Sequence, residues 1–121
     1  MAVSSVADCL FCGIVAGEVP ADIVRTDERT VAFRDINPQA PVHVLVVPRR
    51  HIVNAATVTA TDAEEVTALL LAAQQIAAAE GIDGEDRGYR LVFNVGPDAL
   101  NSVPHLHLHV LGGRTFDWPP G

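Results

Sequence analysis

The ten residues 104–113, PHLHLHVLGG, decide the fold that we expect for this chain. Three histidines, His105, His107 and His109, alternate there with aliphatic residues. Successive side chains of a β-strand point to opposite faces, so a strand over residues 105–111 turns all three imidazoles to one face. The aliphatic side chains turn to the other face. This strand is therefore expected to have one polar, chemically active face and one face that is buried in the core.

The segments before this strand predict an α+β fold. A long helix is expected over residues 61–80, because apolar residues recur there at helical spacing and Gly81 follows. A short N-terminal helix is expected over residues 9–16, with Asp8 as its cap. Further strands are predicted at residues 23–25, 30–35, 41–47 and 89–95. Strands joined by short turns favour a mostly antiparallel sheet, with one long and one short helix.

The composition predicts one folded domain over residues 1–121, because 49% of the residues are hydrophobic and only 19% are charged. The longest apolar runs, residues 42–47 and 66–71, are too short to cross a membrane. No segment has the pattern of a signal peptide, so we expect a cytoplasmic protein with no membrane partner. The net charge of −7 argues against a nucleic-acid partner, which needs a basic surface.

The three alternating histidines require a chemical explanation, because buried imidazoles are costly unless a ligand, a metal or a hydrogen-bond network uses them. His43, in the run 41–47, joins them if that strand neighbours the last one. One alternative is a metal site formed by the three histidines alone, although neighbouring residues on one strand face seldom converge on an ion. The other is attack of an imidazole on phosphorus through a phosphohistidine. A neighbouring imidazole, or Ser102 in the preceding loop, would then assist the phosphoryl oxygens or the leaving group.

The two cysteines, Cys9 and Cys12, have the spacing C-x-x-C. In a reducing compartment this spacing indicates metal binding or redox chemistry more than a structural disulfide. The surrounding sequence lacks the βαβ pattern of a thioredoxin-like site.

The stretch at residues 104–113 resembles the His-φ-His-φ-His-φφ signature of the histidine triad (HIT) superfamily, where φ is a hydrophobic residue. Residues 35–43 (DINPQAPVH), 47–51 (VPRRH) and 118–121 (WPPG) are similar to the Hint branch of that superfamily. This resemblance implies an α+β homodimer that hydrolyses nucleoside 5′-phosphoramidates and related adenylates. The implied substrate carries a purine nucleoside monophosphate, which passes through a covalent nucleotidyl-histidine intermediate.

The resemblance also implies roles for individual residues. His107 matches the nucleophile, His109 the contact to the phosphate and leaving group, and His43 a fourth histidine that supports the site. Asp35 matches the carboxylate that holds the ribose hydroxyls, since an ionised carboxylate accepts from both hydroxyls of a cis-diol. The remaining matches are apolar residues around the base, polar contacts near the phosphate, and a tryptophan that reaches towards the partner subunit's site: Phe11, Ile14, Phe33 and Ile36; Asn94 and Ser102; and Trp118.

Some bacterial HIT proteins carry a similar cysteine pair and bind zinc. By this resemblance Cys9, Cys12, His51 and His105 form a zinc site, and two thiolates with two imidazoles suit tetrahedral zinc. A zinc-bound His105 would be structural and not catalytic, and the sequence leaves both roles open.

The chain departs from the family pattern at Leu100-Asn101, where Gly-Gln is frequent, and at Pro104, which has no N–H to donate. Two other activities stay open beside the phosphoramidase. One is a dinucleoside polyphosphate hydrolase from another branch of the superfamily. The other is a nucleotide-binding or partner-binding module in which turnover is incidental.

Overall fold

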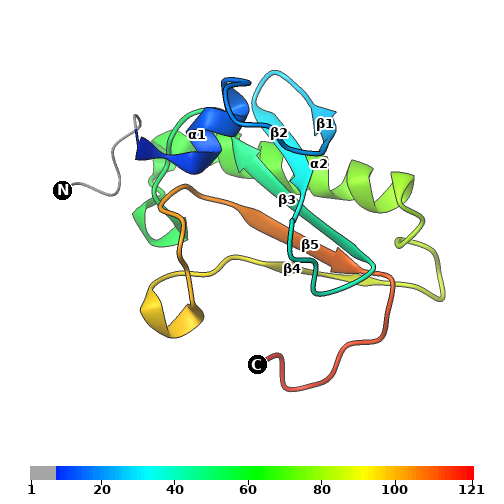
Figure 1. Ribbon diagram of the computed structural model, residues 1–121. Coiled ribbons are helices and arrows are strands. Elements are labelled where there is room, and N and C mark those ends of the chain that lie inside the picture. Colours follow the sequence, from blue (N-terminus) through cyan, green and yellow to red (C-terminus); the bar gives the residue numbers. More distant parts are fainter. Residues whose placement is uncertain (1–7) are drawn as a thin grey trace.

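A computed structural model describes residues 8–121 of the chain (Figure 1). Residues 1–7, the start of the predicted domain, lie outside this range. The described part has one five-stranded sheet and helices on both of its faces, which confirms the predicted α+β class. None of the helices in residues 8–121 combines the length and apolar character that a membrane crossing requires.

The sheet is antiparallel throughout, with the strand order β1-β2-β3-β5-β4. Its strands are β1 (Ile23–Thr26), β2 (Thr30–Arg34), β3 (Val42–Pro48), β4 (Tyr89–Val92) and β5 (Leu108–Gly112). The first three follow the chain order because short turns join them. β5 lies between β3 and β4, so His43 and the triad histidines belong to neighbouring strands or their extensions.

The helix α2 (Ala63–Ala79) packs on one face of the sheet (Figure 1). Its buried side chains form one core cluster with Val44 and Val46 of β3 and with Leu108 and Val110 of β5. Gly81, with φ of +73°, follows the helix in the left-handed conformation that commonly ends a helix. The aliphatic face of the quoted stretch is therefore buried, as its alternation predicts.

The helix α1 (Leu10–Val15) packs on the opposite face. Phe11 and Ile14 of this helix form a second cluster with β-strand residues such as Phe33. Six residues are too few to form a stable helix in isolation, so the position of α1 depends on its contacts with the sheet. The predicted cap was wrong, because Cys9 caps α1 in place of Asp8: its Sγ accepts the Cys12 N–H at 3.3 Å.

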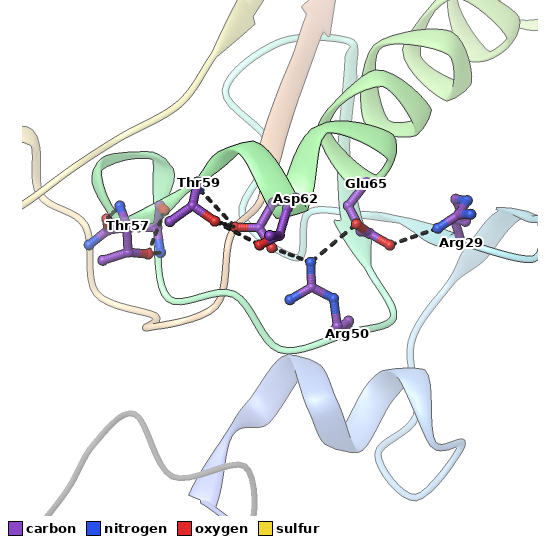
Figure 2. A network of polar contacts seen from close by, with 8 residues as sticks. Arg29, Arg50, Thr57, Thr59, Asp62 and Glu65 are labelled. Atoms are coloured by element: carbon purple, nitrogen blue, oxygen red, sulfur yellow. Dashed lines mark hydrogen bonds and ion pairs between the residues drawn. The ribbon is translucent and has the colours of Figure 1, made fainter.

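A network of charged side chains fixes the segment between β3 and α2 (Figure 2). Arg50 contacts Asp62 and also Glu65, the latter at 3.1 Å. Glu65 binds Arg29 at 2.8 Å, which ties the β1–β2 turn to α2. The segment contains two 3-10 turns, η2 (Ala55–Thr57) and η3 (Ala60–Asp62). It also carries His51, three residues after the end of β3.

The last strand is shorter than predicted, since β5 begins at Leu108 and not at His105. Its partner β3 ends at Pro48, which has no N–H for the ladder. The Pro48 carbonyl lies 2.9 Å from His105 Nε2, and the Leu106 N–H donates to Ile52 instead. Residues 105–107 therefore lie beyond the ladder, although the alternation of their side chains continues. β4 likewise ends at residue 92, and the predicted strand reached residue 95.

Candidate active site

A cleft of about 460 Å³ opens on the face of the sheet that carries α1. His107 and His109 line it together with residues of α1, β2 and the loop before β5. His109 pairs with Leu45 of β3, which belongs to the cluster beneath α1, and this register fixes the imidazole on that face. A hollow of similar volume at residues 86–90 and 114–116 contains no imidazole or thiol. The chemistry is therefore concentrated in the first cleft.

A backbone carbonyl sets the tautomer of His107. The Nδ1 atom of this ring lies 2.7 Å from the carbonyl oxygen of His105. A carbonyl only accepts hydrogen bonds, so Nδ1 carries the proton and Nε2 keeps its lone pair. Burial lowers the pKa of His107 below its usual value, which favours the neutral ring, although the carbonyl contact opposes the shift. The ring also packs edge to face against Phe11, at 5.1 Å between centroids. His107 is thus a held, neutral imidazole with an unprotonated Nε2.

A second relay sets the tautomer of His109. The backbone N–H of Gln39 donates to His43 Nδ1 at 3.0 Å, so the proton of a neutral His43 is on Nε2. That Nε2 lies 2.9 Å from His109 Nδ1, which therefore accepts. The proton of His109 is then on Nε2, which lies 3.4 Å from Asn94 Nδ2; since an NH₂ group only donates, the Asn94 amide accepts this proton when it is turned to present Oδ1. His109 offers an N–H donor beside the lone pair of His107.

The electrostatics of this relay favour neutral rings. Burial, helped by the neighbouring His107 and His43, lowers the pKa of His109 to about 4. Burial also lowers the pKa of His43, and the carboxylate of Asp35 opposes that shift from 3.4 Å. An anionic phosphate near these rings would favour their protonated forms. The site is therefore able to take up a proton when such a ligand binds.

Asp35 lies just after β2, at the edge of the same cleft. Its Oδ1 accepts the backbone N–H of Asn37 at 2.9 Å, and its side chain is 20% exposed. Lone pairs of the carboxylate remain free for hydroxyl donors. Phe11, Ile14 and Phe33 give the cleft an apolar wall nearby.

The two cysteines and two histidines form a separate cluster behind the cleft. Cys9 Sγ lies 3.2 Å and Cys12 Sγ 3.4 Å from His105 Nδ1, and Cys12 Sγ lies 3.3 Å from His51 Nδ1. These four ligand atoms all lie within 4.8 Å of one another. Because His105 Nε2 donates to the Pro48 carbonyl, the Nδ1 lone pair faces the sulfur atoms. Two thiols and two imidazoles, of which that of His105 is oriented by this hydrogen bond, match the donor set of a tetrahedral zinc site.

Burial shifts the pKa values of this cluster, and a bound cation would stabilise the deprotonated side chains. Burial, with the neighbouring Cys9, raises the pKa of the Cys12 thiol to about 11. Burial lowers the pKa of His105 to about 4. The ring of His105 is fully buried and does not line the cleft, so the structure separates it from His107 and His109.

The structure brings most of the predicted site residues together. The predicted residues that line the cleft are Phe11, Ile14, Phe33, Asp35, Ile36, Asn94, Ser102, His107 and His109. His43 lies behind His109. Trp118 lies outside the cleft and is 81% exposed, with Arg90 over its ring at 5.9 Å.

Sequence reasoning missed several groups that shape the site. Leu10 and Leu100 also line the cleft. The backbone N–H of Gln39 and the carbonyls of His105 and Pro48 orient the rings. No side-chain pattern identifies such backbone groups. For Leu100 the sequence did carry a signal, because a leucine stands there where the family often has a glycine.

Fold and site together define an α+β protein with a histidine-lined cleft and a thiol–imidazole cluster beside it. The family model described as HIT domain matches residues 16–116, and the chain belongs to this family. The predicted histidine triad resemblance is thereby confirmed.

Individual proteins show the same likeness. An uncharacterized HIT-like protein of Synechococcus elongatus is 48% identical over 114 residues, which cover 94% of this chain and 97% of that protein. The crystal structure of a HIT family hydrolase from Legionella pneumophila matches with a TM-score of 0.89 and 49% identity, over 93% of this chain and 99% of that one. A zinc-bound histidine triad family protein from Mycobacterium smegmatis matches with a TM-score of 0.78 and 33% identity, over 94% of this chain and 81% of that one.

Proposed function

We propose that this protein hydrolyses nucleoside 5′-phosphoramidates and related adenylates at the α-phosphate, with His107 as the nucleophile. The observation that carries the proposal is the contact between His107 Nδ1 and the His105 carbonyl, which leaves Nε2 unprotonated in the cleft. The similarity to a protein named a HIT family hydrolase supports hydrolysis.

The cleft accommodates such a substrate in three parts. The base lies against Phe11, Ile14 and Phe33, and the ribose hydroxyls donate to Asp35. The α-phosphate then lies between His107 and His109, within reach of Ser102 from the loop before β5. A purine nucleoside monophosphate is the group that we expect to be transferred.

The reaction uses the lone pair of His107 Nε2 and requires that His109, which is neutral in the free site, takes up a proton when the anionic substrate binds. The lone pair of His107 Nε2 forms a bond to phosphorus while the bond from phosphorus to the leaving nitrogen breaks, and a protonated His109 gives its Nε2 proton to that nitrogen. The His105 carbonyl stabilises the positive charge that forms on the His107 ring. A water molecule then attacks phosphorus, gives a proton to His109 and releases His107 with the nucleoside monophosphate.

Cys9, Cys12, His51 and His105 would hold a structural zinc ion. When bound, the ion would cross-link α1 to the end of β3 and to the segment before β5. The chain's own residues already orient His105 for this role through the Pro48 carbonyl. The zinc-bound relative from Mycobacterium smegmatis supports the choice of metal.

We also propose that the active form is a cytoplasmic homodimer. Trp118 is 81% exposed and lies outside its own cleft, which supports a contact with the partner subunit's site. Light scattering of the purified protein tests the association state.

The cleft favours a phosphoramidate over a dinucleoside polyphosphate. Among residues 8–121, Arg34 is the only arginine or lysine in the lining of this cleft, and it is already paired with Glu80 at 3.0 Å. A polyphosphate leaving group would therefore find no unpaired arginine there. Turnover of an adenosine 5′-phosphoramidate that exceeds turnover of a diadenosine polyphosphate is the expected result.

The deciding experiment is to mix the protein with an adenosine 5′-phosphoramidate, quench it rapidly and search its peptides by mass spectrometry. The nucleotidyl mass is expected on the peptide that contains His107. The His107→Ala variant should lose this label and its turnover, and should still bind adenosine monophosphate within about tenfold of the wild type. A label on another residue, or turnover near the wild-type rate in this variant, would refute the mechanism. Binding without any turnover in the wild type would favour a binding module.

A further inference from the structure

Leu100 has a backbone conformation that leucine rarely adopts. It follows the 3-10 turn η4 (Pro97–Ala99) with φ of 59° and ψ of 32°, and no other non-glycine residue in 8–121 has a positive φ. In this left-handed conformation the Cβ atom crowds the following carbonyl, so glycine or asparagine is the usual occupant. Backbone strain of this kind concentrates at functional sites. The left-handed backbone of Leu100 therefore indicates a functional role for this residue.

Leu100 lines the cleft and is 86% exposed. Leu10 of α1 lines the same cleft and is 50% exposed. Figure 1 shows α1 and the loop that follows β4 at the same end of the sheet, although they are far apart in the sequence. Two large apolar side chains thus line one opening, and nothing in residues 8–121 covers Leu100.

The proposed reaction places the leaving group beside this loop. Phe11, Phe33 and Asp35 take the nucleoside, and His107 attacks the phosphorus. In an in-line displacement the departing group lies on the side of phosphorus opposite to the attacking atom. Ser102, which lines the cleft and is proposed to reach the phosphate, is two residues after Leu100. In the proposed binding mode the departing group therefore lies towards the loop of residues 96–104, which contributes Leu100 and Ser102 to the lining of the cleft.

We propose that Leu100, together with Leu10, forms an apolar subsite for the group displaced from phosphorus. The preferred substrates are nucleotidyl compounds whose leaving amine or acyl group carries an aromatic or branched aliphatic substituent. The lining supports this class, because its one arginine is occupied by Glu80 and offers no partner to an anionic leaving group. The inference rests on the proposed function and adds the identity of the leaving group to it.

Two substrates of similar leaving-group basicity test the inference: the adenosine 5′-phosphoramidates of phenethylamine and of 2-methoxyethylamine. The wild type is expected to show a kcat/KM about tenfold higher for the phenethylamine compound, as is usual for an apolar group in a modest pocket. Leu100→Asn keeps a residue that tolerates the left-handed backbone and removes the apolar side chain, and Leu100→Gly removes the side chain and the strain. Both variants are expected to reduce the ratio of the two kcat/KM values to about one.

Leu71→Asn is the matched control, because Leu71 is 53% exposed on α2 and does not line the cleft. It should keep the wild-type ratio. Equal kcat/KM values for the two substrates in the wild type would overturn the inference and leave the proposed function intact. No cleavage of either compound would refute the proposed function itself, and the inference with it. Leu100 variants that alter the association state in light scattering but keep the ratio would show that a second copy of the chain covers Leu100, which also overturns the inference.

Discussion

Asp35→Asn is expected to weaken the binding of adenosine monophosphate by removing the acceptor for the ribose hydroxyls. Asp35 Oδ1 already accepts the Asn37 N–H at 2.9 Å, and Oδ2 lies 3.4 Å from His43 Nε2. An asparagine keeps the first contact and replaces the second oxygen by an NH₂ group, which cannot accept. The nucleoside therefore loses an ionised acceptor while the turn after β2 keeps its hydrogen bond.

The size of the effect follows from the value of one hydrogen bond to a charged group. Such a bond contributes roughly 1.5–3 kcal/mol. We expect a loss of about 2 kcal/mol, which corresponds to a roughly thirtyfold higher Kd for adenosine monophosphate.

Calorimetry of two proteins with two ligands isolates this interaction. Wild type and Asp35→Asn are each titrated with adenosine monophosphate and with its 2′,3′-dideoxy analogue, which forms a double-mutant cycle. The substitution should weaken the first ligand strongly and the dideoxy ligand by no more than about threefold. Asp83→Asn, at an exposed carboxylate outside the cleft, should change neither. An equal loss for both ligands would show that Asp35 acts only through His43 or the fold, and the ribose assignment would fail.

Three further outcomes test other parts of the structure. Replacing Cys12 by alanine, or removing bound metal with a chelator, should weaken the binding of adenosine monophosphate about tenfold in calorimetry. The reason is that α1 carries the apolar wall of the cleft and would lose its cross-link to the sheet. Unchanged affinity would contradict this link. Because the folded protein lowers the pKa of His109 to about 4, the unfolded chain binds the extra proton below pH 6.5, so stability falls as the pH falls towards 4. Urea titrations at pH 7.5 and 5.5 should show a loss in the wild type that is about 1 kcal/mol larger than the loss in His109→Gln, which keeps the other buried histidines with lowered pKa values; equal losses would count against the shift. Gly112→Ala should lower the free energy of unfolding by about 1–3 kcal/mol, since its Cβ would lie 2.6 Å from Ile82 Cδ1, whereas Gly88→Ala meets no atom within 4 Å and should be nearly neutral.

The sequence was sufficient to predict the faces of the quoted stretch, because the two-residue period of an extended chain survives even where the strand has ended. Leu106 and Leu108 are buried on the α2 side, and His107 and His109 line the cleft. The start of the strand could not be predicted from this pattern. It depends on Pro48, which lies on another strand and ends the ladder there.

In the candidate site, too, the sequence indicates which side chains take part but not how they are arranged. The C-x-x-C spacing indicated a metal or redox pair, and only the family resemblance added His51 and His105 to it, because Cys12 and His51 are 39 positions apart in the sequence and meet through the fold. The Gln39 N–H and the His105 carbonyl, which set the tautomers, are groups that nearly every residue possesses. Composition therefore carries no sign of them.

His105 contacts the thiol cluster and His107 with two different parts of the same residue. Its imidazole faces the sulfur atoms, whereas its main-chain oxygen holds the ring of His107. Substitution at this position deletes the first of these and leaves the second, since every amino acid has that oxygen. In evolution the contacts between this imidazole and the sulfur atoms can therefore be lost from such a chain while the ring of His107 keeps its hydrogen bond to the main chain.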